Sequence, residues 1–241
     1  MSQPDHLSLR ILLAVLIVGT ACSAIAGGSR IDKIYHPYVQ PLEHEIEFRT
    51  ISENGTAVVP GDRTIARLGY GQSVGDNWSV EAYLIGEKND DRNFYIRAFE
   101  TEALGQLTEQ GEYFTDAALL LDIESKFDGA LTELSSALLL ENEWGHWSGT
   151  ANLYGIYEFG NDVNNKFETA LNLQGRYRYR IHFEPSIELY KARNTFGIGP
   201  VFLGSYPLGN AHKLHWETGL ILGLDSDTPD RTIRMLVEYE F

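Results

Sequence analysis

The motif closest to a nucleophilic site in this sequence is His146-Trp147-Ser148, with Asn152 four residues after the serine. Nucleophilic catalysis by serine needs a histidine base and an orienting side chain within hydrogen-bond reach. Residues two apart on a β-strand share a face, so His146 and Ser148 can meet only if this segment is a strand. The motif is therefore a candidate hydrolase site, and whether its side chains can meet depends on the secondary structure of this segment.

Metal and nucleotide chemistry have less support. The seven histidines are scattered, the chain has one cysteine, and no His-Glu-x-x-His motif occurs. Gly69-Tyr70-Gly71 and Gly197-Ile198-Gly199 lack the helix and lysine that a phosphate loop requires. We expect these glycines to allow bending or to make room for an aromatic ring. No metal site and no cofactor is predicted.

Carboxylates are the most abundant chemical groups of the chain. The sequence has 34 acidic and 19 basic side chains and a formal net charge of -15. Nucleic acid is excluded as a partner, because phosphate binding requires clustered lysine and arginine. The same acidity disfavours a peripheral anchor on anionic lipid.

The elements that position these groups show a period of two. In the last strand, Thr232, Arg234, Leu236, Glu238 and Glu240 alternate with apolar residues, which are Ile233, Met235, Val237, Tyr239 and Phe241. Turn signals rich in Gly, Asn and Asp separate similar segments along the chain. The segments expected to be strands are 43-52, 62-73, 78-88, 92-105, 112-125, 130-143, 147-159, 166-179, 182-192, 194-206, 212-225 and 231-241.

An even number of amphipathic strands predicts an all-β fold with a single closed antiparallel transmembrane barrel of twelve strands. Each segment is long enough to cross a bilayer when tilted, and closure leaves no unpaired strand edge in hydrocarbon. A soluble β-sandwich or periplasmic barrel would also alternate. The distribution of aromatic residues favours the membrane barrel, because they fall near one set of turns as an interfacial girdle. These residues are Trp78, Trp144, Trp147, Tyr177, Tyr179, Tyr206, Trp216, Tyr239 and Phe241.

The C-terminal strand ends at the periplasm in barrels of this kind, which fixes the expected orientation. The connections at Asn89, Asp128, Asn161 and Asp227 should then be extracellular. The fourth segment breaks the pattern, because strict alternation would send Glu100 toward lipid unless a β-bulge shifts the phase or the strand leaves the membrane there. Glu102 is affected in the same way.

Residues 1–26 read as a secretory signal peptide. Arg10 supplies its positive region, residues 11–18 its apolar core and Ala24-Ile25-Ala26 its cleavage site. The apolar run is too short for a spanning helix. A lipoprotein signal ending at Cys22 is the weaker alternative, since Gly19 stands where such signals carry Leu or Val.

After the signal peptide, we expect residues 27–42 to form a periplasmic N-terminal segment and residues 43–241 to form the outer-membrane barrel domain. The expected location is therefore the outer membrane of a Gram-negative bacterium.

At its C-terminus and its signal peptide the chain resembles Gram-negative outer-membrane β-barrel proteins. The alternating residues Ile233, Met235, Val237, Tyr239 and Phe241 carry this likeness. The resemblance implies that they form an assembly signal for the barrel assembly machinery. The opening from Tyr35 to Arg49 also looks like a group of uncharacterised small outer-membrane barrels, with no activity implied.

The side of each strand opposite the apolar residues should face the lumen. The expected lumen-facing acidic residues are Glu45, Glu47, Glu81, Asp116, Asp122, Glu133, Glu141, Glu168, Glu188, Glu217 and Glu238. The expected lumen-facing basic residues are Arg49, Arg67, Arg97, Arg176, Arg178 and Arg234. A water-filled lumen with this acidic excess attracts cations and repels anions. In a dry lumen the same groups would form a closed ion-pair network.

These observations predict a narrow passive channel for small cationic or neutral solutes. In size the chain is similar to the monomeric channels for acidic oligosaccharides, but it lacks their lumen lined with Arg and Lys. A closed barrel with a structural or surface-interaction role is the first alternative. The second is a lipid-modifying hydrolase at His146 and Ser148, because the motif resembles that of the twelve-stranded phospholipase A family. In that family the site faces the outer leaflet, whereas His146 is expected at a periplasmic turn, so we predict no enzyme.

The expected partners follow from this location. They are outer-membrane lipid, lipopolysaccharide and, during biogenesis, the barrel assembly machinery. A monomer is expected.

Overall fold

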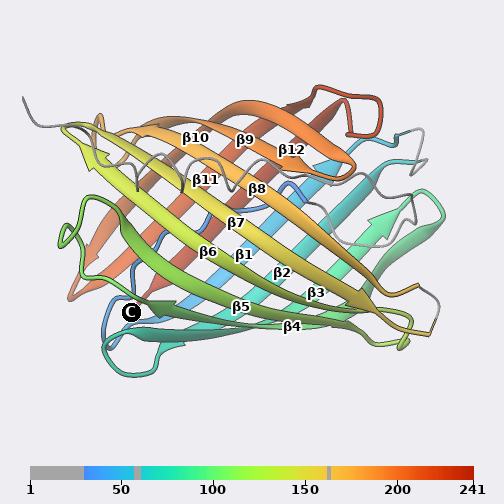
Figure 1. The fold of residues 1–241 in the computed structure, drawn as a ribbon, viewed down its shortest axis with the longest axis horizontal. Coiled ribbons are helices and arrows are strands. Elements are labelled where there is room, and N and C mark those ends of the chain that lie inside the picture. Colours follow the sequence, from blue (N-terminus) through green and yellow to red (C-terminus); the bar gives the residue numbers. More distant parts are fainter. Residues whose placement is uncertain (1–29, 57–60, 162–163) are drawn as a thin grey trace, which may run out of the picture.

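The computed structural model describes residues 30–56, 61–161 and 164–241 and shows twelve antiparallel strands closed into one barrel (Figure 1). The strands are β1 (His44–Glu53), β2 (Arg63–Ser73), β3 (Trp78–Asn89), β4 (Arg92–Gln106), β5 (Asp116–Lys126), β6 (Thr132–Trp144), β7 (Trp147–Phe159), β8 (Lys166–Tyr177), β9 (Glu184–Ala192), β10 (Thr195–Gly209), β11 (His212–Gly223) and β12 (Arg231–Glu240). Each strand pairs with its neighbours in the chain, and β1 pairs with β12 to close the sheet. The predicted fold class is confirmed.

Among the described residues, no helix has the length and hydropathy that crossing a membrane requires.

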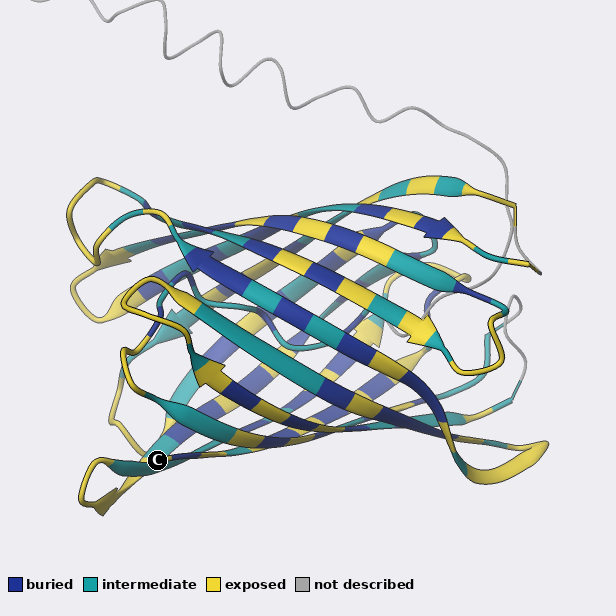
Figure 2. Cartoon of the chain, turned by 90° about the horizontal axis from the view of Figure 1, so that it is seen from below, coloured by how far each residue is buried: buried dark blue, intermediate teal, exposed yellow. Residues whose placement is uncertain are grey.

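The alternating sequence determines which side chains point outward (Figure 2). In β12, Ile233 and Met235 are 49% and 52% exposed to the surroundings of the barrel, whereas Arg234 between them is 1% exposed. The same alternation covers the outer wall with leucine, isoleucine, valine and aromatic side chains. So large an apolar surface is stable in contact with lipid rather than water.

The connections between strands lie at two ends of the barrel. We call one the Phe241 end, where the chain also enters β1, and the other the Asp128 end. The four connections expected to be extracellular, at Asn89, Asp128, Asn161 and Asp227, share the Asp128 end.

Aromatic residues form a girdle at the Phe241 end, as the sequence predicts. Tyr239 stacks on His212, with ring centroids 5.7 Å apart, and on Phe241 at 5.5 Å. Exposed members of the girdle on other strands and turns are Trp78, Trp144, Trp147, Tyr179 and Tyr206. Rings of this amphipathic kind suit the boundary between lipid and water.

A β-bulge resolves the irregular pattern of β4. The ladder with β3 shifts register between Ile85 and Gly86, which leaves Arg97 as an extra residue in β4. Because an extra residue reverses the alternation, Glu100 and Glu102 point into the barrel, where they are 6% and 3% exposed. The outward-facing residues ahead of the bulge are Phe94 and Ile96.

Candidate functional site

The segment that precedes β1 passes through the inside of the barrel. Arg30 contacts acidic residues near the Asp128 end, and Tyr38 contacts Asp116 near the Phe241 end. Between these points, residues 30–39 bind inward-facing side chains from strands β1 to β9. Contacts on all of these strands place the segment within the lumen, which it crosses along its length (Figure 1). We call residues 30–39 the lumen segment.

This course corrects the expectation that residues 27–42 form a separate periplasmic segment. Residues 27–29, like the predicted signal peptide, lie outside the described residues, but residues 30–39 are enclosed by the barrel. The physical reason is charge. The inner wall has fewer basic than acidic side chains, and the segment supplies two further bases, Arg30 and Lys33.

Two cations anchor the segment to acidic residues of the wall. The Arg30 guanidinium lies 2.8 Å from Glu133 Oε1 and 2.7 Å from Glu158 Oε1. The Lys33 Nζ lies 2.8 Å from Glu47 Oε2. Glu158 and Glu47 are 0% and 1% exposed, and each also pairs with a base of the wall, so the segment supplies a second cation to each buried carboxylate.

Two further side chains of the segment bind the wall. Asp32 Oδ1 accepts a hydrogen bond of 2.8 Å from Arg49, and its Oδ2 lies 3.4 Å from Arg67 Nε. The His36 Nδ1 lies 2.5 Å from Glu141 Oε2. The segment therefore pairs with wall charges of both signs.

Apolar contacts hold the segment from two sides. Ile31 and Ile34, 1% and 3% exposed, pack with residues of β9, β10 and β11, which are Tyr190, Val201, Leu203 and Ile221. Val39 and Tyr35 pack on the opposite wall against Leu104, Ala118, Leu120, Ala137, Leu139 and Tyr154. The inward face thus includes apolar surface that the segment removes from water.

Asn152 fixes the backbone of the segment. Its Oδ1 accepts a 2.8 Å hydrogen bond from the Tyr35 N–H, and its Nδ2 donates one of 2.8 Å to the Tyr35 carbonyl. Asn152 is 0% exposed. A residue that sequence reasoning assigns to a hydrolase motif therefore holds the lumen segment.

The structure places the predicted lumen residues of both signs along the inner wall. Buried acidic members are Glu47, Asp116, Asp122, Glu141, Glu188 and Glu217, and partly buried ones are Glu45, Glu81, Glu133, Glu168 and Glu238. Buried basic members are Arg49, Arg67, Arg97 and Arg234, with Arg176 partly buried. Arg178 follows the end of β8 and pairs with Glu143 at the rim.

Three buried charges form a triad on strands β9, β11 and β12. Arg234 Nη2 lies 2.5 Å from Glu188 Oε1, and Arg234 Nη1 lies 2.6 Å from Glu217 Oε2. Their side chains are 1%, 0% and 6% exposed. The arginine thus compensates two buried carboxylates of the wall.

A cavity of about 250 Å³ opens in the barrel at the Phe241 end. Its acidic lining comprises Glu43, Glu45, Glu81, Glu217, Glu238 and Glu240, and its basic lining comprises Lys33, Lys213, His36 and His215. Burial, together with a hydrogen bond to Glu240, raises the pKa of Glu43 to about 8. The cavity is therefore an acidic vestibule that ends at the lumen segment.

The candidate hydrolase residues do not assemble. Ser148 is buried, and its Oγ lies 3.4 Å from Arg176 Nε. His146 is exposed in the turn between β6 and β7, with its ring 5.8 Å from that of Tyr177. With Asn152 bound to the lumen segment, the three side chains have separate partners.

Solved outer-membrane barrels share this fold. A KdgM porin in complex with disordered oligogalacturonate matches with a TM-score of 0.53 at 12% identity, over 82% of this chain and 98% of that chain. An outer membrane channel from Pseudomonas putida F1 matches with a TM-score of 0.51 at 10% identity, over 90% and 99%. The translocator domain of the autotransporter NalP from Neisseria meningitidis gives 0.54 at 10% identity, over 84% and 88%. The chain thus has the fold of outer-membrane β-barrels.

No protein-family model matches the sequence, and no curated protein does.

Proposed function

We propose that the protein is a narrow passive channel of the Gram-negative outer membrane that favours small cationic or neutral solutes. The observation that carries this proposal is the acidic vestibule of about 250 Å³, in which six carboxylates face two lysines and two histidines. Low-dielectric walls focus the field of such an excess, which raises the local concentration of cations and excludes anions.

The lumen segment sets the bore of this channel. Its ion pairs and apolar contacts reach opposite walls, so a solute must pass beside it or displace it. The KdgM porin binds an oligogalacturonate, which is an acidic oligosaccharide. The acidic wall of the present barrel supports a preference for cations instead of anions.

The extent of these contacts also supports a second candidate, a barrel that the segment keeps closed. In that case the protein serves a structural or surface role in the membrane, among lipid and lipopolysaccharide. The two candidates share the proposed outer-membrane location, the monomeric state and assembly through the C-terminal strand.

Conductance in planar bilayers distinguishes the two functions. The folded protein is compared with a variant that lacks residues 30–39 and with Glu81→Gln, which removes one vestibule carboxylate that lies 3.5 Å from Lys33. Asp91→Asn, in the β3–β4 turn, is the control for loss of one charge outside the lumen. Heat-modifiable gel mobility verifies that each variant folds.

A channel predicts discrete current steps and a cation-selective reversal potential in a salt gradient. The deletion should enlarge the current steps, and Glu81→Gln should weaken cation selectivity more than Asp91→Asn does. If the intact protein is silent but the deletion conducts, the closed barrel is the correct function. Silence of both folded proteins refutes a conducting lumen.

A further inference from the structure

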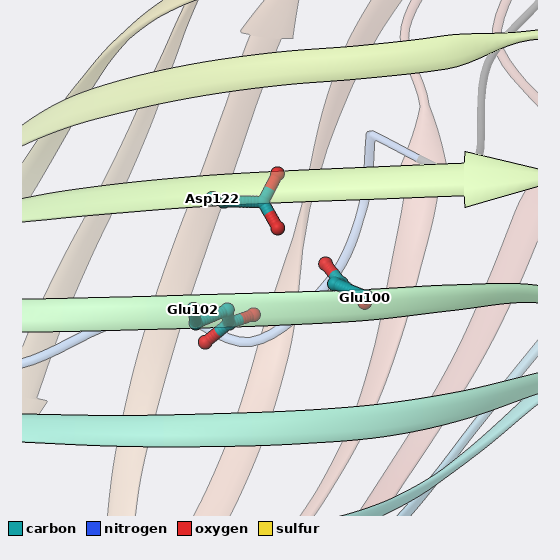
Figure 3. A group of neighbouring side chains, drawn as sticks. All are labelled: Glu100, Glu102 and Asp122. Carbon is teal, nitrogen blue, oxygen red and sulfur yellow. The ribbon is translucent and has the colours of Figure 1, made fainter.

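Three carboxylates converge on the inner wall between β4 and β5 (Figure 3). They belong to Glu100, Glu102 and Asp122, and one oxygen from each lies within 4.8 Å of the others. Glu100 and Glu102 share a face of β4, and Glu102 stands directly opposite Asp122 in the ladder. Like charges in directly opposed positions destabilise a sheet.

The existing partners occupy only part of this cluster. Glu100 pairs with Arg67. Glu102 Oε1 accepts a hydrogen bond of 2.5 Å from the Tyr35 hydroxyl, and Asp122 Oδ1 accepts one of 3.1 Å from Ser135. Among the described residues, the pair with Arg67 is therefore the one ion pair of these three carboxylates.

Apart from Glu100 Oε2, which pairs with Arg67, two oxygens in the cluster are buried without a hydrogen-bond partner. They are Glu102 Oε2 and Asp122 Oδ2, on side chains of residues that are 3% and 9% exposed. An unpaired carboxylate oxygen in such a place has lost its hydration without replacement. A ligand that supplies positive charge between these two oxygens removes that penalty.

We propose that Glu100, Glu102 and Asp122 form a binding site for a hard divalent cation, with calcium as the best fit. The donor set contains only carboxylate oxygens, which calcium and magnesium prefer over softer metals. Calcium accepts six to eight oxygens in flexible geometry, including bidentate carboxylates, whereas magnesium demands a near-ideal octahedron. Three carboxylates held on two adjacent strands suit the more tolerant ion.

The bound cation bridges β4 and β5 and lies against the lumen segment. Tyr35 connects the two, because its hydroxyl binds Glu102 while its backbone binds Asn152. Cation binding therefore stabilises the wall where the segment docks.

Calcium titration of the folded protein tests the site. The protein is stripped with EDTA, freed of lipopolysaccharide and titrated calorimetrically with Ca²⁺. Saturable binding of one ion per chain is expected. Glu102→Gln and Asp122→Asn should each weaken binding about tenfold or more, because each removes one of three anionic ligands. Glu184→Gln, a lumen carboxylate on β9, is the matched control and should leave the affinity unchanged.

Terbium luminescence provides a second test in a variant that keeps all three carboxylates. Tb³⁺ in the site is sensitised by the Tyr35 ring, so Tyr35→Phe should lower the Ca²⁺-displaceable emission of the protein. Absence of Ca²⁺ binding by the folded wild-type protein overturns the proposal. Equal affinity in wild type, Glu102→Gln and Asp122→Asn, or Ca²⁺-displaceable emission that Tyr35→Phe leaves unchanged, also overturns it.

Discussion

Replacement of Asn152 by leucine should loosen the lumen segment without opening the barrel. The side chain makes two hydrogen bonds of 2.8 Å with the backbone of Tyr35, and leucine of similar volume makes neither. We call the segment seated when it is docked on the inner wall and unseated when it has left it. At a net value of about 1 kcal/mol for each hydrogen bond, the seated state loses about 2 kcal/mol of stability relative to the unseated one. Because about 1.4 kcal/mol corresponds to a tenfold change in an equilibrium, the unseated population should rise roughly 30-fold.

Trypsin measures that population, because Arg30 and Lys33 are cleavage sites that lie bound to wall carboxylates. When the segment reseats faster than it is cut, the rate of cleavage follows the unseated fraction. Mass spectrometry of the released fragments should show cleavage at both sites about 30-fold faster in Asn152→Leu.

Asn172→Leu is the matched control, since Asn172 faces Asn152 directly across the β7–β8 ladder. Its cleavage rate should stay close to that of the wild-type protein. Equal rates in Asn152→Leu and wild type, with both barrels folded, would refute the anchoring role of Asn152.

Two further predictions concern stability. Arg234→Met removes the arginine that pairs with the buried carboxylates of Glu188 and Glu217, so the free energy of unfolding should fall by about 3–5 kcal/mol. Combining Arg234→Met with Glu188→Gln and Glu217→Gln should restore most of the lost stability, which urea titration in lipid vesicles measures. A triple variant no more stable than Arg234→Met alone would contradict the charge explanation. Burial and the hydrogen bond to Glu240 raise the pKa of Glu43 to about 8, so Glu43 binds its proton more tightly in the folded protein. Its contribution to the free energy of unfolding is therefore complete below about pH 4.5 and is lost as pH rises through about 8. Glu43→Gln should therefore flatten the fall in unfolding free energy between these values, and an unchanged pH profile would show that another group titrates.

The lumen segment shows where sequence reasoning fell short. Arg30 and Glu158 lie 128 positions apart and meet only because the barrel closes around the segment. A signal was nevertheless present, since the wall carboxylates outnumber the wall bases and the residues before β1 carry Arg30 and Lys33. An uncompensated inward charge indicates that another part of the chain supplies the counterions.

The sequence by itself determined the strands, their number and, wherever the alternation is unbroken, the face on which a side chain lies. Alternation is a local property of extended backbone, so Ile233 and Arg234 were assigned to opposite faces without knowledge of any other strand. Only the tertiary structure decided where alternation fails and what fills the lumen. The bulge at Arg97 depends on the register with β3, and it turned Glu100 and Glu102 inward to face Asp122. Contacts across the lumen depend on closure and on the path of residues 30–39, and no periodicity in the sequence records either of them.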